Sequence, residues 1–290
     1  MDTNFLFVNA LNGIIYGSFL LLTSLGLSLI FGLGRVVNFA HGALYALGGY
    51  FLLAVMPRIG GYWPALVIGP LMVVPVAVAL ERLTISPVRN RPDIYTLLVT
   101  FGVSFVIVGA IEYLWGTGTA VISAPSPFEG TLSVFGNQYP IYRLFAAGLS
   151  LVVSVVVFAI VQFTPIGLQI RAISDDASMA EALGIDTKWL LRIVFGGAAG
   201  LAAFAAALGA PIFAVHPEMG MSILVDSFLA VILGGLGYLP GSAAGAFIVA
   251  LTKSIGGGYI ADWSIALLFV VVGVVLILRP TGVFKRGRIA

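Results

Sequence analysis

Long apolar runs separated by short polar stretches dominate the chain. Seven of these runs reach the length that a membrane-crossing helix needs, which is about 20 residues. They cover 6–33, 37–56, 63–81, 94–116, 141–163, 190–214 and 259–279. In lipid, every backbone N–H and C=O group must be paired within helices or a closed barrel, and unbroken runs of this length favour helices. The pattern therefore predicts an all-α integral membrane protein.

An eighth apolar stretch, 222–254, differs from the others because glycines and a proline interrupt it. The interruption reads Gly-Gly-Leu-Gly-Tyr-Leu-Pro-Gly over 234–241, and such residues break a helix. We predict two half-helices that enter and leave the membrane by the same face and break at mid-depth. Unwound backbone around Gly234, Gly235 and Gly237 would then offer polar groups to a solute. The alternative is a packing hairpin that never meets solute.

Composition excludes a soluble protein. Of the 290 residues, 60% are hydrophobic and 9% are charged, whereas soluble domains carry about 25% charged residues. Because cysteine is absent, neither disulfide bonds nor thiolate metal sites can form. The net charge of +2 is too small to indicate nucleic-acid binding. The amino terminus lacks the basic stretch of a cleavable signal peptide, so we expect the first run to be retained as a span.

Lysine and arginine indicate the orientation, because they accumulate in cytoplasmic loops. If the loop 82–93 is cytoplasmic, most of the basic residues fall inside. The inside set is Arg35, Arg82, Arg89, Arg91, Arg171, Lys188, Arg192, Arg279, Lys285, Arg286 and Arg288, and the outside set is Arg58, Arg143 and Lys253. This distribution requires that the stretch 222–254 enters and leaves the membrane by the same face. It places the carboxyl terminus in the cytoplasm and the amino terminus outside.

Tryptophans and glycines mark expected helix ends and helix contacts. Tryptophan rings settle at membrane interfaces, and all four lie at the ends of predicted spans, namely Trp63, Trp115, Trp189 and Trp263. Small residues four apart allow two helices to approach closely. Three such G-x-x-x-G patterns begin at Gly13, Gly196 and Gly241.

The loop 164–189 carries helix signals of its own. Ser174 is a suitable N-cap, and Asp175 and Asp176 follow where the helix dipole favours carboxylates. Gly184 is placed to end the helix. We predict a helix of two to three turns with a small apolar face, which comprises Ala177, Ala180, Leu183 and Ile185. The alternative is an amphipathic connector on the membrane surface.

Three stretches carry a resemblance to a known family. They read Asn-Phe-Ala-His-Gly-Ala-Leu-Tyr-Ala-Leu-Gly-Gly-Tyr over 38–50, Leu-Gly-Gly-Leu-Gly-Tyr-Leu-Pro-Gly-Ser over 233–242, and Arg-Pro-Thr-Gly-Val-Phe over 279–284. With Ala180-x-x-x-Gly184 in an Arg-Ala-x-x-x-Asp context, they resemble the permeases of the high-affinity Leu/Ile/Val type of ABC importers. The match extends in order over essentially the whole chain. It departs from the general importer signature because no Glu-Ala-Ala triplet precedes Gly184 at the usual spacing.

The resemblance implies a single transmembrane permease domain over 1–290, in a bacterial inner membrane, with a cytoplasmic loop that docks on an ATPase subunit. The residues that it assigns to coupling are Arg171, Ser174, Asp175, Asp176, Ala177, Ala180, Glu181 and Gly184. It also implies a second permease subunit, homologous or identical, two cytoplasmic ATPases and an external solute-binding protein. Related permeases are thought to serve branched-chain and other amino acids, urea, amides or small carboxylates.

Enzymatic chemistry is not expected in the chain itself. It has no G-x-x-x-x-G-K-[ST] loop, so the resemblance leaves ATP to partner subunits and implies no cofactor here. Its two histidines form no H-E-x-x-H motif, and no carboxylate pair has a spacing that suggests acid/base work. We therefore predict neither catalytic residues nor a metal site.

Polar side chains within spans are costly and mark a candidate solute path. Asn38 and His41 share a face of one predicted span, and Thr100 and Ser104 share a face of another. Hydrogen bonding between helices is the alternative for the first pair, and hydroxyl bonds to the preceding helical turn are the alternative for the second. Asp226 and Glu112 are explained by a helix cap and an interfacial position. The rival function is a self-sufficient channel or ion-coupled secondary transporter, for which these two carboxylates would be the ion sites.

Overall fold

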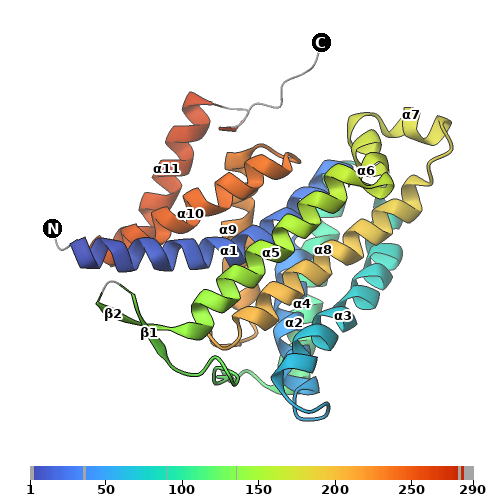
Figure 1. The fold of residues 1–290 in the computed structure, drawn as a ribbon. Helices are drawn as coiled ribbons and strands as arrows, with labels where there is room; N and C mark the ends of the chain where they lie inside the picture. The colour runs from blue at the N-terminus through green and yellow to red at the C-terminus, as the bar shows by residue number, and fades with distance from the viewer. Residues whose placement is uncertain (1–2, 35–36, 90, 135, 280–281, 284–290) are drawn as a thin grey trace.

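The computed structural model describes residues 3–34, 37–89, 91–134, 136–279 and 282–283. Helices make up most of this part of the chain (Figure 1). The α-helices are α1 (Thr3–Gly34), α2 (Ala40–Val55), α3 (Tyr62–Leu80), α4 (Asp93–Trp115), α5 (Ile141–Phe163), α6 (Pro165–Asp175), α7 (Ala177–Ala182), α8 (Thr187–Gly209), α9 (Met219–Gly234), α10 (Leu239–Tyr259) and α11 (Ser264–Leu278). A π-helical turn (Glu81–Ile85) and a 3₁₀ turn (Ser86–Val88) extend α3, and a second 3₁₀ turn (Ala261–Trp263) precedes α11. Strands β1 (Thr131–Val134) and β2 (Asn137–Pro140) form an antiparallel hairpin.

The predicted all-α membrane fold is confirmed in outline. Within the described residues, six helical segments are long and apolar enough to cross a membrane, and they contain α1, α3, α4, α5, α8 and α10. Shorter apolar helices are α2, α9 and α11. The predicted span 141–163 coincides with α5, whereas α8 ends five residues before the predicted 214 because Ala210 begins a turn. All four tryptophans lie at or beside helix ends, as predicted.

The helix α1 lies at the centre of the fold and contacts α5, α8, α9 and α10. Most of its length is buried, whereas most residues of α3, α4 and α5 are exposed or only partly buried. The exposed apolar side chains of α4 include Leu98, Phe105, Val106 and Tyr113. Exposed apolar side chains of this density suit a lipid environment, because a soluble surface would need a polar shell.

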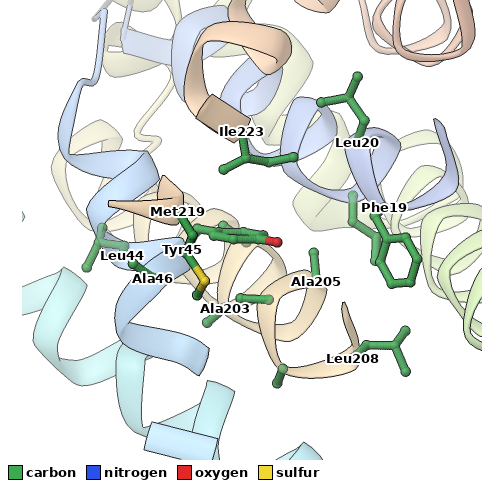
Figure 2. Packing of buried hydrophobic residues seen from close by; sticks show 14 of the residues in the cluster. Phe19, Leu20, Leu44, Tyr45, Ala46, Ala203, Ala205, Leu208, Met219 and Ile223 are labelled. Atoms are coloured by element: carbon green, nitrogen blue, oxygen red, sulfur yellow. The ribbon is translucent and has the colours of Figure 1, made fainter. Parts of the chain in front are cut away.

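Small residues set the distances between the central helices. Figure 2 shows Tyr45 of α2 and Met219 of α9 packed among alanines of α8, next to Phe19 and Leu20 of α1. A Cβ atom at Gly48 would overlap Ala203, so only glycine allows α2 to pack this close to α8. The three predicted glycine patterns all lie at such contacts: Gly13 packs on α10, Gly196 on α3 and Gly241 on α9. Close packing of this kind holds helices together where lipid gives no hydrophobic drive.

The molecule has two distinct ends, which we call the α7 end and the hairpin end (Figure 1). Ion pairs from Glu81 to Arg89 and Arg192 join the π-helical turn to the first turns of α8 at the α7 end. At the hairpin end, the Tyr139 hydroxyl of β2 donates to Asn12 of α1. No strand was predicted from the sequence. The hairpin forms where Gly136 adopts a positive φ of 82° between two short extended segments.

The stretch 222–254 differs from its prediction in length and in the position of its break. Two antiparallel helices, α9 and α10, meet at a turn in which Gly235 and Gly237 have positive φ. The turn lies beside Gly32 near the end of α1, and its Gly237 lines a cavity with Ser174 of α6. The break is therefore at the α7 end, not at mid-depth. With 21 residues, α10 is long enough to cross a membrane and is no half-helix.

Candidate functional site

Two cavities flank the first half of α9. The tyrosine cavity, of about 540 Å³, is lined by Tyr16, Tyr45 and Phe213 among others. The phenylalanine cavity, of about 680 Å³, is lined by Phe39, Phe101, Phe105 and Phe269 among others. Both volumes fall in the range of about 300–1,000 Å³ that is usual for small-molecule sites. Three residues line both cavities, namely His216, Ser222 and Lys253.

An ion pair lies at the boundary between the cavities. The ammonium group of Lys253 on α10 donates to Asp226 Oδ2 on α9 at 2.5 Å. The hydroxyl of Tyr16 on α1 donates to the same oxygen, and the Lys253 nitrogen lies 5.3 Å from the Tyr16 ring centroid. The Asp226 side chain is 6% exposed, whereas that of Lys253 is 34% exposed, so the lysine is the member that opens to the cavities. Ionisable groups inside a membrane helix bundle are costly and are functional candidates by default.

The sequence interpretation of Asp226 is wrong, and that of Lys253 missed its partner. Asp226 was expected to cap a half-helix, but it lies near the middle of α9. Lys253 was assigned to the external side of the membrane, at the end of a half-helix, whereas it lies within α10 and pairs with Asp226. The error follows from the re-entrant prediction, which ended the second half-helix at 254. A helix that continues to Tyr259 carries Lys253 inside the bundle, and an acidic and a basic residue in two adjacent apolar helices were the available signal.

Asn38, His41 and Thr100 surround the segment that leads into α2. The Asn38 Oδ1 accepts from the Ala40 N–H at 3.1 Å, and the Thr100 hydroxyl bonds the backbone of Val37 and Phe39. His41 Nε2 lies 3.1 Å from the carbonyl oxygen of Thr23 on α1. All three side chains are buried, and none lines the cavities described here. The His41 contact matches the alternative of hydrogen bonding between helices, whereas the Asn38 bond lies within its own segment. The Thr100 hydroxyl also contacts the Leu97 carbonyl one turn earlier, as its own alternative predicted. A role in a solute path stays a prediction.

Ser104 and the glycines of the α9–α10 turn occupy different places. Ser104 donates to the Phe101 carbonyl at 2.6 Å, as its alternative predicted, and it also lines the phenylalanine cavity. Gly234 packs against Gly241, and Gly235 packs against Gly282. Gly237 lines a third cavity of about 470 Å³ together with Arg171 and Ser174. The structure thus brings part of the turn next to the loop 164–189, a contact that was not predicted from the sequence.

The loop 164–189 forms two helices where one was predicted. Ser174 does not cap a helix: it lies in the last turn of α6 and bonds the Ile170 carbonyl at 2.9 Å. Thr164 caps α6, and Asp176 caps α7 by accepting from the Met179 N–H at 3.0 Å. Asp175 ends α6. Arg171 donates to the carbonyls of Val161 and Gln162, which end α5. Cationic donors at a helix C-terminus satisfy its free carbonyl groups.

The short helix α7 ends as predicted at a glycine. Gly184 has a φ of 87°, its N–H donates to the Glu181 carbonyl, and the Ile185 N–H donates to the Ala180 carbonyl. These two bonds and the left-handed residue form a Schellman motif. The Glu181 carboxylate accepts from the Thr187 hydroxyl. The short helix is therefore fixed at both ends.

The exposed face of α7 matches the predicted one only in part, because Ala177 and Leu183 are exposed whereas Ala180 is buried. Ala180 is 1% exposed and packs inward against Ile170, Ile173 and Leu190. Ala177 is exposed, but the large apolar side chains that face away from the protein are Met179 and Leu183, which are 58% and 75% exposed. A pair of large exposed apolar side chains on a polar loop indicates a contact with another protein or with lipid.

Comparisons with known proteins find the same kind of permease over nearly the whole chain. A family model described as branched-chain amino acid transport system, permease component, matches residues 9–279. The high-affinity branched-chain amino acid transport system permease protein LivH of Salmonella typhimurium is 26% identical over 296 residues, which cover 96% of this chain and 95% of LivH. The corresponding protein BraD of Pseudomonas aeruginosa is 26% identical over 304 residues, with the same coverage of both chains.

A solved structure of an ABC transporter in an inward-facing conformation is similar in fold. Its TM-score is 0.53 at 15% sequence identity, and the match covers 93% of this chain and 86% of that chain. Among the described residues, no cluster of three or more histidine, aspartate or glutamate side chains is placed to hold a metal ion. The candidate functional features of the described residues are thus the two cavities beside the Asp226–Lys253 pair and the exposed face of α7.

Proposed function

The chain belongs to the family of permease components of branched-chain amino acid transport systems, and from that premise we propose that it forms the membrane passage of an ATP-driven importer. The solute would be a branched-chain amino acid or a related small polar molecule, as the names of its relatives suggest. The observation that carries this proposal is the family match over nearly the whole chain, together with the capped helix α7 that presents Met179 and Leu183 outward.

The proposed partners follow from the same premise. A second permease subunit, homologous or identical, completes the passage, and two ATPases bind the α7 ends of the two permeases. The exposed apolar pair on α7 supports a protein partner, because the buried core of a protein interface is more apolar than the rest of the surface. A solute-binding protein docks at the hairpin end. ATP binds only to the ATPase subunits.

Purification and reconstitution test this function. We expect the chain, expressed with its ATPases, second permease and binding protein, to copurify with the ATPases in mild detergent. In proteoliposomes, radiolabelled leucine uptake should require both ATP and the ATPases. Uptake by this chain alone, driven by an ion gradient, would instead identify the rival secondary transporter. The neighbouring genes offer an independent check, since they should encode the three proposed kinds of partner, namely ATPases, a second permease and a solute-binding protein.

The proposed orientation places the α7 end in the cytoplasm and the carboxyl terminus with it. The basic tail, 285–288, and Arg35 lie outside the described residues. Nevertheless, Arg82, Arg89 and Arg192 lie near the α7 end, in agreement with the accumulation of basic residues in cytoplasmic loops.

Single cysteines test this orientation in a chain that has no cysteine of its own. We expect Lys188→Cys at the α7 end to react with a membrane-impermeant maleimide only from the cytoplasm, since Lys188 is exposed there. Glu129→Cys, exposed before the hairpin, should react only from outside. Labelling of intact cells measures reactivity from outside, and labelling of inverted vesicles measures reactivity from the cytoplasmic side. Reactivity of both positions from one side would refute the orientation.

A further inference from the structure

We propose that the Asp226–Lys253 pair binds the ammonium and carboxylate groups of a zwitterionic amino acid, with the side chain of that amino acid in the phenylalanine cavity. This inference rests on the proposed transport function and names the contact that would select its solute. The pair is held by three helices, α1, α9 and α10, and it lies at the boundary of two cavities of small-molecule size.

Both charged groups keep unused hydrogen-bonding capacity. Tyr16 and Lys253 both donate to Asp226 Oδ2, and no contact to Oδ1 is seen among the described residues. An ionised carboxylate has about four acceptor positions on two oxygens, and an ammonium group has three donors. The described contacts use one donor of Lys253. The pair can therefore accept an ammonium group on the aspartate and donate to a carboxylate from the lysine without losing its own bond.

A zwitterion suits this pair better than a singly charged solute does. The two charges of an α-amino acid are attached to one carbon atom, so they lie about as close together as the two members of a contact ion pair. Binding adds one charge of each sign, and the net charge of the buried site does not change. A solute with a single charge would leave one added charge uncompensated in a bundle where isolated charges are costly.

The cavity beside the pair is suited to an apolar side chain. Asp226 and Lys253 both line the phenylalanine cavity, where Phe101 and Phe105 of α4 and Phe269 of α11 supply aromatic surface. Besides the ion pair, the polar residues of the lining are Ser104, His216, Glu218 and Ser222. Burial of a branched aliphatic group against these rings would contribute to affinity through the hydrophobic effect, which does not depend on a precise orientation of the group. The arrangement fits leucine and its homologues and not urea or small carboxylates.

A purely structural ion pair makes a different prediction, and the difference can be measured. Removing one member of a buried pair leaves the other charge uncompensated, whereas removing both relieves this cost. If the pair only fastens α9 to α10, the double variant Asp226→Asn/Lys253→Gln should therefore function better than either single variant. If the pair binds solute, the double variant stays defective because both contacts are lost.

Protection of an introduced cysteine reports binding directly. Ser222 lines both cavities, and Ser222→Cys creates the only thiol in the chain. In the assembled complex with its ATPases, in nanodiscs and without the binding protein, we expect leucine to slow maleimide labelling of this cysteine. Adding Asp226→Asn, Lys253→Gln or both should weaken the apparent affinity for leucine by about tenfold or more. Two analogues that each lack one charge, 4-methylpentanoate and isopentylamine, should not protect.

Controls separate this inference from the proposed function. Glu112→Gln neutralises a carboxylate of α4 that lines neither cavity, and leucine protection should be unchanged in that background. Copurification of the ATPases with each variant checks assembly. The inference is overturned if leucine does not protect Ser222→Cys, if the neutralised variants are protected equally, or if either analogue protects as leucine does. If the unaltered complex shows no ATP-dependent uptake of leucine, the proposed function itself is overturned.

Discussion

Replacing Leu183 with aspartate should abolish ATP-dependent uptake while the protein still inserts in the membrane. Leu183 is 75% exposed and lies directly before Gly184, which ends α7. Because the side chain makes little contact within its own chain, the change should cost little folding stability, within about 0.5 kcal/mol. At an apolar contact with an ATPase, however, a buried unpaired charge should cost about 2 kcal/mol or more, which is about 30-fold in affinity. Copurification of the ATPases and uptake in proteoliposomes measure the two effects.

A matched control distinguishes a coupling contact from a general effect of surface charge. Leu132 in β1 is 53% exposed and belongs to the opposite end of the molecule, so Leu132→Asp should still copurify with the ATPases. Met179→Asp should resemble Leu183→Asp, because Met179 is the other large exposed side chain of α7. Normal ATPase binding and uptake in both α7 variants would rule out α7 as the docking helix.

Ala180 illustrates why the short helix α7 could be located but not oriented from the sequence. The signals for a short helix and its glycine stop were present, and Gly184 does adopt the left-handed conformation. The predicted N-cap was Ser174, however, whereas the structure uses Asp176, which was expected only to favour the helix dipole. This choice rotates α7 so that Ala180 faces inward. Ala180→Trp would therefore disturb the packing of the loop and not a docking surface.

The spans were predictable because lipid imposes a simple requirement on length and polarity. The contact between Asp226 and Lys253 was not, because it depends on the relative rotation of two helices and on how far α10 continues beyond Ser254. Hydropathy contains almost no information on the rotation of a helix or on the residue at which it ends. The same limitation explains why Asn38 and His41 were favoured for a solute path: polarity identifies a side chain that needs a partner but does not say whether the partner is solute or Thr23.

The crossing of α2 and α9 gives the prediction with the largest expected effect on folding. Gly42 and Gly220 face each other, and a Cβ atom on either would overlap the backbone carbonyl of the other. Backbone cannot move aside as a side chain can, so Gly42→Val should force the two helices apart. Overpacking costs about 3 kcal/mol or more in such cases, and the midpoint of thermal unfolding should fall by roughly 10 °C. Thermal unfolding of the purified protein in mild detergent, followed by size-exclusion chromatography, measures this loss.

The control for Gly42→Val is the same substitution in a different environment. Gly102 lies in α4, where a Cβ atom would meet no other atom within 4 Å. Because glycine is a poor helix former, Gly102→Val should leave stability unchanged or raise it slightly. Both glycines of the crossing line the phenylalanine cavity, so separation of the helices should also destroy the solute contact proposed for Asp226 and Lys253. If the Gly42→Val protein is as stable as the Gly102→Val protein, α2 and α9 do not pack through Gly42 and Gly220. The phenylalanine cavity would then not be lined by these two glycines.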